Sequence, residues 1–203
     1  GLGESVIDEL VSDLEKASNP TLGLSAKFGQ IDLRITAKGN TFLETKKLIS
    51  DFESQIRRRL GINIFGSDDE TLALVTNRML YEKGIQLETL EINTNGCLSA
   101  AIEPKNLFSQ TIKSEDPDSL TSDDIFMKHI AETGYPYSIA LINRKDKMQN
   151  QIHSKIYFKM NTNIYHKERF YNSLTFSDEQ PVLLAMELIR ETILNEANTE
   201  TEM

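Results

Sequence analysis

The chain has 203 residues, of which 39% are hydrophobic, and a formal net charge of -9. Residues 1–66 hold nine basic and nine acidic side chains, so the whole negative excess lies in residues 67–203. Such a surface repels a phosphate backbone, and we expect no nucleic-acid binding by the second part. The sequence has no apolar run of membrane-spanning length, no signal-peptide pattern and a single cysteine. We therefore predict a cytoplasmic protein with no membrane partner.

Residues 1–66 have the patterns of a small α+β layer. Apolar residues at helical spacing predict an amphipathic helix over about 5–17 and a second helix from about 41 to 60, which Gly61 ends. Between the helices, "TLGLSAKF" and "QIDLRITA" predict a β-hairpin, and "INIF" after the second helix predicts a third strand. This order indicates helices on one face of an antiparallel sheet.

Strands and helices alternate in residues 67–203 before a long hairpin and a closing helix. Ser67 is expected to start a helix, "IQLETLEI" and "YPYSIALIN" are typical of buried strands, and Asn161-Thr162-Asn163 is expected to join two long strands. A last helix is expected over about 178–195. The sequence predicts a mixed-sheet α/β domain over 67–196 and a disordered tail at 197–203.

Four motifs of the first half resemble one known family. They are "GLGES" at 1–5, "NPT" at 19–21, "GQIDLRITA" at 29–37 and "QIRRRLGINIFGSDDETL" at 55–72. In this order they resemble the middle section of the competence- and damage-inducible CinA family, and the resemblance extends to about residue 102. It implies a KH-like linker domain over 1–66 and a CinA C-terminal-like domain over 67–196. It also implies that a MoaB-like domain precedes this piece in a longer parent protein.

Nucleic-acid binding by the KH-like section is not expected. A working KH module clamps the nucleic-acid backbone with a G-x-x-G loop, and residues 1–66 contain none. The basic run from Arg57 to Arg59 lies near the end of the second predicted helix, where positive charge complements the helix dipole. We therefore predict a structural role for this run.

The second resemblance concerns "LETLEINTNGCLSAAI", residues 87–102. In the CinA family the C-terminal domain hydrolyses the amide of nicotinamide mononucleotide through a helix-capping loop of the form A-E-S-C-T-G-G. Ile92 stands at the Ser of this pattern and has no nucleophilic atom, so we predict no catalytic residue. The loop would remain as a vestigial nucleotide pocket of Glu91, Ile92, Asn93, Thr94, Asn95 and Gly96.

Other family signatures are also altered. After "YSIAL", where the family has the Gly-rich loop T-G-I-A-G-P, this chain reads "INRKDKMQ", and "TFSDEQ" replaces a later G-D-R. The family segment with a catalytic Lys is shortened to "LFSQTIKSED", and Lys113 is not assigned to that role. These departures favour a degenerate site.

Metal and cofactor chemistry has little support in the sequence. The three histidines, His129, His153 and His166, and the lone Cys97 occur without H-x-x-H or C-x-x-C spacing. The acidic stretch from 115 to 124 lacks the spacing and central glycine of an EF-hand. We predict no metal and no cofactor, and a packing role for Cys97.

Three functions remain open. The first is a non-catalytic structural, regulatory or oligomerisation module, for which the aromatic residues of the hairpin at 152–174 offer a homo-oligomer surface. The second is a nicotinamide-nucleotide amidohydrolase with a relocated nucleophile, Thr94 or Ser99. The third is a module that binds a nicotinamide nucleotide without turnover.

Overall fold

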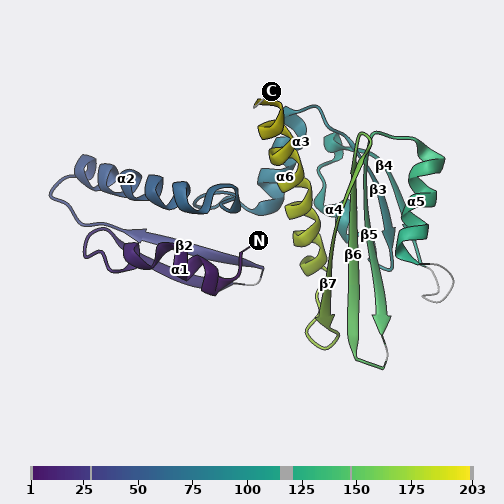
Figure 1. Ribbon diagram of the computed structural model, residues 1–203, viewed down its shortest axis with the longest axis horizontal. Coiled ribbons are helices and arrows are strands. Elements are labelled where there is room, and N and C mark those ends of the chain that lie inside the picture. Colours follow the sequence, from purple (N-terminus) through teal and green to yellow (C-terminus); the bar gives the residue numbers. More distant parts are fainter. Residues whose placement is uncertain (1, 28, 115–120, 147, 202–203) are drawn as a thin grey trace. The chain divides into compact units, whose positions relative to one another are not determined.

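The computed structural model describes residues 2–27, 29–114, 121–146 and 148–201. It divides into two compact units, Gly1–Phe65 and Gly66–Met203 (Figure 1). The first unit has a two-stranded sheet and the second a five-stranded mixed sheet, which confirms the predicted fold class. None of the described helices combines the length and the apolar content needed to cross a bilayer.

The first unit is a β-hairpin between two long helices. Its elements in order are α1 Glu4–Glu15, β1 Thr21–Lys27, β2 Gln30–Thr36, α2 Phe42–Leu60 and the 3-10 helix η1 Gly61–Asn63. The predicted hairpin is confirmed, with antiparallel pairing from Thr21 opposite Thr36 to Lys27 opposite Gln30. The predicted third strand is wrong, because the chain turns at Gly61 with φ of 54° and continues as η1.

The core of the first unit comes from matched helix faces. It contains Ile7, Val11 and Leu14 of α1, Leu22 of β1, and Phe52, Ile56 and Leu60 of α2. These spacings of three and four residues place each helical set on one side of its helix. The expected helical stripes therefore form one common core with β1.

The basic run at the end of α2 lies in ion pairs within the first unit. Arg59 forms a two-pronged pair with Asp13, with 2.8 Å between Nη2 and Oδ2, and also donates to the carbonyl of Leu10 at 3.1 Å. The Arg59 guanidinium lowers the pKa of Asp13 to about 2. Arg57 pairs with Glu53 one turn earlier. Arg59 thus connects α2 to α1, and Arg57 forms its ion pair within α2.

The second unit contains the five-stranded sheet in the order β4-β3-β5-β6-β7. Strand β3 is parallel to both β4 and β5, whereas β5-β6 and β6-β7 are antiparallel. The elements in chain order are α3 Leu72–Glu82, β3 Leu87–Ile92, α4 Cys97–Ala101, η2 Pro104–Asn106, β4 Leu107–Lys113, α5 Ser122–Thr133, β5 Tyr137–Asp146, β6 Gln151–Met160, β7 Asn163–Asn172 and α6 Glu179–Thr201.

Helices cover both faces of this sheet. Helix α5 packs on one face, and α6, with α3 and α4 beside it, packs on the other (Figure 1). On the α5 side, Phe126 stacks on Tyr157 of β6 with ring centroids 4.8 Å apart. On the α6 side, the hydroxyl of Thr76 in α3 donates to the carbonyl of Met186 in α6. The sheet is therefore the middle of three layers.

Two helix boundaries differ from the sequence predictions. Helix α3 begins at Leu72 and not near Ser67, because the Thr71 side chain accepts a hydrogen bond from the Leu74 amide and caps the helix there. Helix α6 continues to Thr201, so the predicted disordered tail is helical over 197–201, a stretch that lacks Gly and Pro. Residues 202 and 203 lie outside the described part.

Candidate functional site

The predicted pocket segment lies at the carboxyl end of β3, in the middle of the three parallel strands. From there the chain turns to α4 on one face, whereas the connection after β4 leads to α5 on the other face. Ligands of open α/β sheets bind where neighbouring strands send their connections to opposite faces. The fold thus brings residues 91–96 to the place where such a ligand would be expected.

A buried carboxylate organises this segment. Glu91 has no exposed surface. Its Oε2 accepts hydrogen bonds from Thr94 Oγ1 at 2.7 Å and the Leu98 amide at 2.9 Å, and its Oε1 accepts from the Ser99 amide at 2.8 Å and from the Ser99 hydroxyl. A carboxylate has about four lone-pair positions. All of them face donors of the chain itself, two for each oxygen.

Ile92 does not share this environment. Successive side chains of a strand point to opposite faces, so Ile92 lies on the α5 side while Glu91 lies on the α4 side. Ile92 is 2% exposed and belongs to an apolar cluster with Ile125 and Phe126 of α5. Strand alternation therefore separates the side chain of Ile92 from that of Glu91, which the sequence had assigned to the same pocket.

The turn after β3 requires left-handed backbone conformations. The φ angles are 57° at Asn93, 56° at Asn95 and 78° at Gly96. Asn and Gly adopt this region at the lowest cost. A Cβ added at Gly96 would lie 2.8 Å from Cδ1 of Ile112 in β4, so this side of the turn is in contact with the neighbouring strand. These three residue types therefore have a structural reason for their positions.

Asn93 also holds the ends of β3 and β5 together. Its Nδ2 donates to the Asn143 carbonyl at 3.2 Å, and Asn143 Nδ2 donates to the Asn93 carbonyl at 3.5 Å. Asn143 in turn accepts from the buried hydroxyl of Ser154 in β6 at 2.6 Å. Sequence reasoning did not identify Asn143 and Ser154. A polar residue at the end of the buried run "YSIALIN" was the available signal.

The two hydroxyls considered as relocated nucleophiles are buried. Thr94 has no exposed surface and Ser99 is 6% exposed. Both donate their hydroxyl hydrogen to the Glu91 carboxylate. A Ser or Thr nucleophile needs a base and also an open approach for the substrate. Here the carboxylate is present, and the approach to both hydroxyls is closed by the surrounding chain.

Comparison with known proteins finds relatives for the first part of the chain. Residues 1–66 match the model of the damage-inducible protein CinA KH domain. A competence-damage inducible protein of Clostridium perfringens (strain SM101) is 42% identical over 102 residues, which cover 50% of this chain and 25% of that relative. Over its first half the chain is therefore similar to proteins of the CinA family. A CinA-like protein of Prochlorococcus marinus (strain MIT 9313) is 37% identical over 102 residues, 50% of this chain and 24% of the relative.

The CinA relatives are much longer than the region they share with this chain. The chain covers about a quarter of the length of the curated proteins it matches. Among solved structures, a CinA superfamily protein of Escherichia coli aligns with a TM-score of 0.43 and 15% identity, over 66% of this chain and 96% of that one. A competence/damage inducible protein of Agrobacterium tumefaciens aligns with a TM-score of 0.43 and 14% identity, over 65% and 97%.

Cys97, the first residue of α4, is a weak nucleophile. Burial, and then the negative charge of Glu91, raise the pKa of its thiol to about 12. The reactive form of cysteine is the thiolate, which is scarce at neutral pH when the pKa is so high. The structure thus supplies a reason for the packing role that the sequence predicted.

Two of the three histidines, His129 and His153, each lie near one carboxylate. His129 of α5 lies 3.4 Å from Glu88, which also accepts a hydrogen bond from Ser138 at 2.9 Å, and His153 lies 3.0 Å from Glu168. Within the described ranges, no group of three or more His, Cys, Asp or Glu side chains is arranged to hold a metal ion. Of the predicted acidic loop, residues 115–120 lie outside those ranges.

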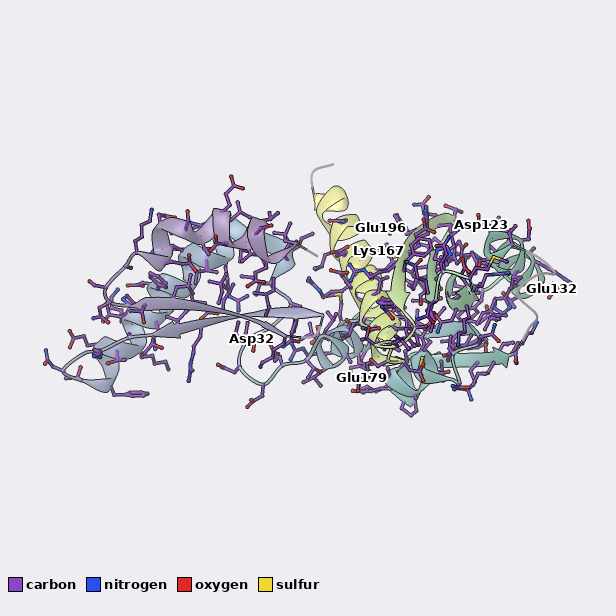
Figure 2. All side chains as sticks on the ribbon, turned by 90° about the horizontal axis from the view of Figure 1, so that it is seen from below. Asp32, Asp123, Glu132, Lys167, Glu179 and Glu196 are labelled. Atoms are coloured by element: carbon purple, nitrogen blue, oxygen red, sulfur yellow. The ribbon has the colours of Figure 1, made fainter. Side chains whose placement is uncertain are left out.

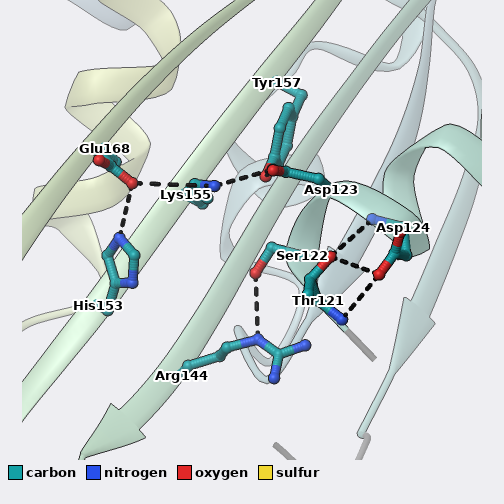
Figure 3. A network of polar contacts seen from close by, with 9 residues as sticks. All are labelled: Thr121, Ser122, Asp123, Asp124, Arg144, His153, Lys155, Tyr157 and Glu168. Atoms are coloured by element: carbon teal, nitrogen blue, oxygen red, sulfur yellow. Dashed lines mark hydrogen bonds and ion pairs between the residues drawn. The ribbon is translucent and has the colours of Figure 1, made fainter. Parts of the chain in front are cut away.

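A second polar cluster joins the start of α5 to β5, β6 and β7 (Figure 3). Asp123 accepts from Lys155 Nζ at 2.8 Å and from the Tyr157 hydroxyl, and its pKa is lowered, first by the Lys155 hydrogen bond. Arg144 Nε donates to Ser122 Oγ at 3.1 Å. The cationic groups drawn there contact acceptors of the chain. The cluster therefore anchors α5 and does not form an open site for an anion.

Proposed function

We propose that residues 66–203 form a non-catalytic interaction module, in which the segment that resembles an amidohydrolase loop serves as a structural turn. The observation that carries this proposal is the occupancy of the Glu91 carboxylate, which accepts hydrogen bonds from Thr94, Leu98 and Ser99. The amides at the start of α4 are the groups that would bind a ligand anion at this turn. Here they bind the chain's own anion.

The other reactive groups support the same conclusion. A hydrolase of this kind needs a nucleophile that can reach the substrate carbonyl. Thr94 and Ser99 are buried, the Cys97 thiol has a pKa of about 12, and Ile92 lies in the core on the opposite face. A substrate would have to displace the internal hydrogen bonds of Glu91 before it met any of these side chains.

The test is incubation of the chain with nicotinamide mononucleotide while ammonia is measured by a coupled assay. The proposal predicts no ammonia above the protein-free blank. Turnover near the usual enzyme range, about 1 s⁻¹ or faster, would contradict the proposal. Loss of this activity in a Ser99→Ala or a Thr94→Val variant would show that the chain itself is its source.

Binding without turnover is tested in the same samples. A rise in the thermal midpoint with increasing nucleotide, but without ammonia, would favour a nucleotide-binding module, since a ligand that binds only the folded state raises its stability. A matched measurement with nicotinamide riboside distinguishes recognition of the phosphate from recognition of the base.

A further inference from the structure

Strand β7 leaves one side of the sheet open. It is the outer strand in the order β4-β3-β5-β6-β7, and β6 is its pairing partner over all ten residues from Asn163 to Asn172. No other described strand pairs with it. In an antiparallel ladder, alternate residues of an outer strand direct their N-H and C=O groups away from their one neighbour. Such a long edge is a template for another strand.

We propose that β7 pairs with β7 of a second copy of this chain, antiparallel, about a two-fold axis at Lys167. The sheets of the two copies would then continue into each other. The proposal rests on the proposed role of residues 66–203 as an interaction module, and it names the partner. Side chains that stand opposite each other across such a junction must belong to the same face of the sheet, which restricts the registers that can form.

The side chains on the α5 face complement each other in this register. Ile164 of one copy stands opposite Phe170 of the other, and His166 stands opposite Glu168. Ile164 is 40% exposed and Phe170 is 58% exposed, so each offers apolar surface that the pairing would cover. Cross-strand apolar pairs and pairs of opposite charge are the contacts that stabilise an antiparallel ladder. Because of the two-fold axis, each pair would occur twice.

The α6 face is compatible with the same register. Tyr165 of one copy stands opposite Arg169 of the other, an arrangement that favours a cation-π contact. Lys167 stands opposite its own copy at the axis. Figure 2 shows Lys167 beside α6. Its Nζ lies 3.1 Å from Glu187 and 2.7 Å from Glu191 of that helix, so its charge is balanced within each chain.

The neighbouring register of the same faces is unfavourable. With the axis at Glu168, this carboxylate would stand opposite its own copy, and Lys167 would stand opposite Arg169. Like charges directly opposite each other destabilise a ladder. The axis at Lys167 brings one like-charged pair together, whereas the axis at Glu168 brings three together. Of these two registers, the charges of β7 therefore favour the one with its axis at Lys167.

Mixing two charge variants of the full chain tests the proposal. Glu168→Lys places Lys opposite His166 in its own dimer, and His166→Glu places Glu opposite Glu168. We expect each variant alone to associate about tenfold more weakly than the original chain, since two attractive pairs become repulsive or are lost. Their equimolar mixture restores both opposite-charge pairs and regains the association. Sedimentation equilibrium measures all three samples, and circular dichroism confirms that each variant is folded.

The matched control is Gln110→Glu, an exposed position on the opposite outer strand β4. Like His166→Glu, it introduces one carboxylate on an outer strand, and it is expected to leave association unchanged. A variant of β7 that weakens association no more than this control would overturn the proposal. So would an original chain that stays monomeric at high micromolar concentration.

Disulfide trapping tests the register. In a Cys97→Ala background, an Ile164→Cys chain mixed with a Phe170→Cys chain should give a cross-linked pair on oxidation. Ile164→Cys alone should not cross-link, because the two positions 164 would be about 20 Å apart, far beyond the roughly 7 Å between Cα atoms that a disulfide spans. Cross-linking of Ile164→Cys alone, with none in the mixture, would overturn the register. Ammonia release would overturn only the non-catalytic role, so the two failures are distinguishable.

Discussion

Replacing Glu91 by Gln changes one atom of a buried side chain and leaves its volume nearly the same. Each carboxylate oxygen accepts from one hydroxyl and one backbone amide, namely those of Thr94, Leu98 and Ser99. A hydroxyl can rotate to accept from the new amide group, but a backbone N-H cannot. Either orientation of the substituted side chain thus leaves one buried N-H without its acceptor. This costs about 1–3 kcal/mol, and the weakening of charged hydrogen bonds to neutral ones brings the expected loss to about 2–4 kcal/mol.

Urea unfolding followed by far-UV circular dichroism measures this loss, since the chain has no Trp for fluorescence. Glu88→Gln is the matched control, because Glu88 is on the same strand, is 5% exposed, and accepts from the rotatable hydroxyl of Ser138. We expect a clearly smaller loss there. If Glu91→Gln were as stable as the original chain, the hydrogen bonds of Glu91 would not be what stabilises this turn.

Three further variants or probes test separate parts of the structure. Asp13→Asn should destabilise the first unit at neutral pH. Because Arg59 lowers the pKa of Asp13 from 3.8 to about 2, the stabilisation is fully present above about pH 4, and the difference from the original chain should disappear as the pH falls through 2. Iodoacetamide should label Cys97 slowly at pH 8 in the folded chain and rapidly in urea, and equal rates would contradict its raised pKa. Ile92→Ser should cost about 3–5 kcal/mol in urea unfolding without producing ammonia from the nucleotide.

The regular elements of the chain follow from patterns that are local in sequence. The alternation of Ile31, Leu33 and Ile35 predicted β2, and the helical stripe that includes Phe52 and Ile56 predicted α2. The strand expected at "INIF" failed because Gly61, with a positive φ, turns the chain at that point. The apolar residues of this stretch do not reveal the turn, since four apolar or neutral residues fit a short strand as well as a turn.

The candidate site was predictable in place but not in detail. The order of strands and helices was enough to position residues 91–96 between a strand and a helix, whereas the place of that strand inside the sheet came from the structure. Matching letters to a loop pattern could not show that Ile92 points away from Glu91, which depends on where β3 ends. Nor could it show that the Glu91 carboxylate accepts from Leu98 and Ser99, since these contacts depend on the position of α4.

The most direct test of the central claim is a titration of the ¹⁵N-labelled chain with nicotinamide mononucleotide, followed at the amides of Leu98 and Ser99. Both amides donate to Glu91 in the structure. If the Glu91 carboxylate occupies the two amides that a ligand would otherwise bind, their signals stay unchanged up to millimolar nucleotide. A saturable shift of both signals would show that the nucleotide reaches the turn, and would contradict the account.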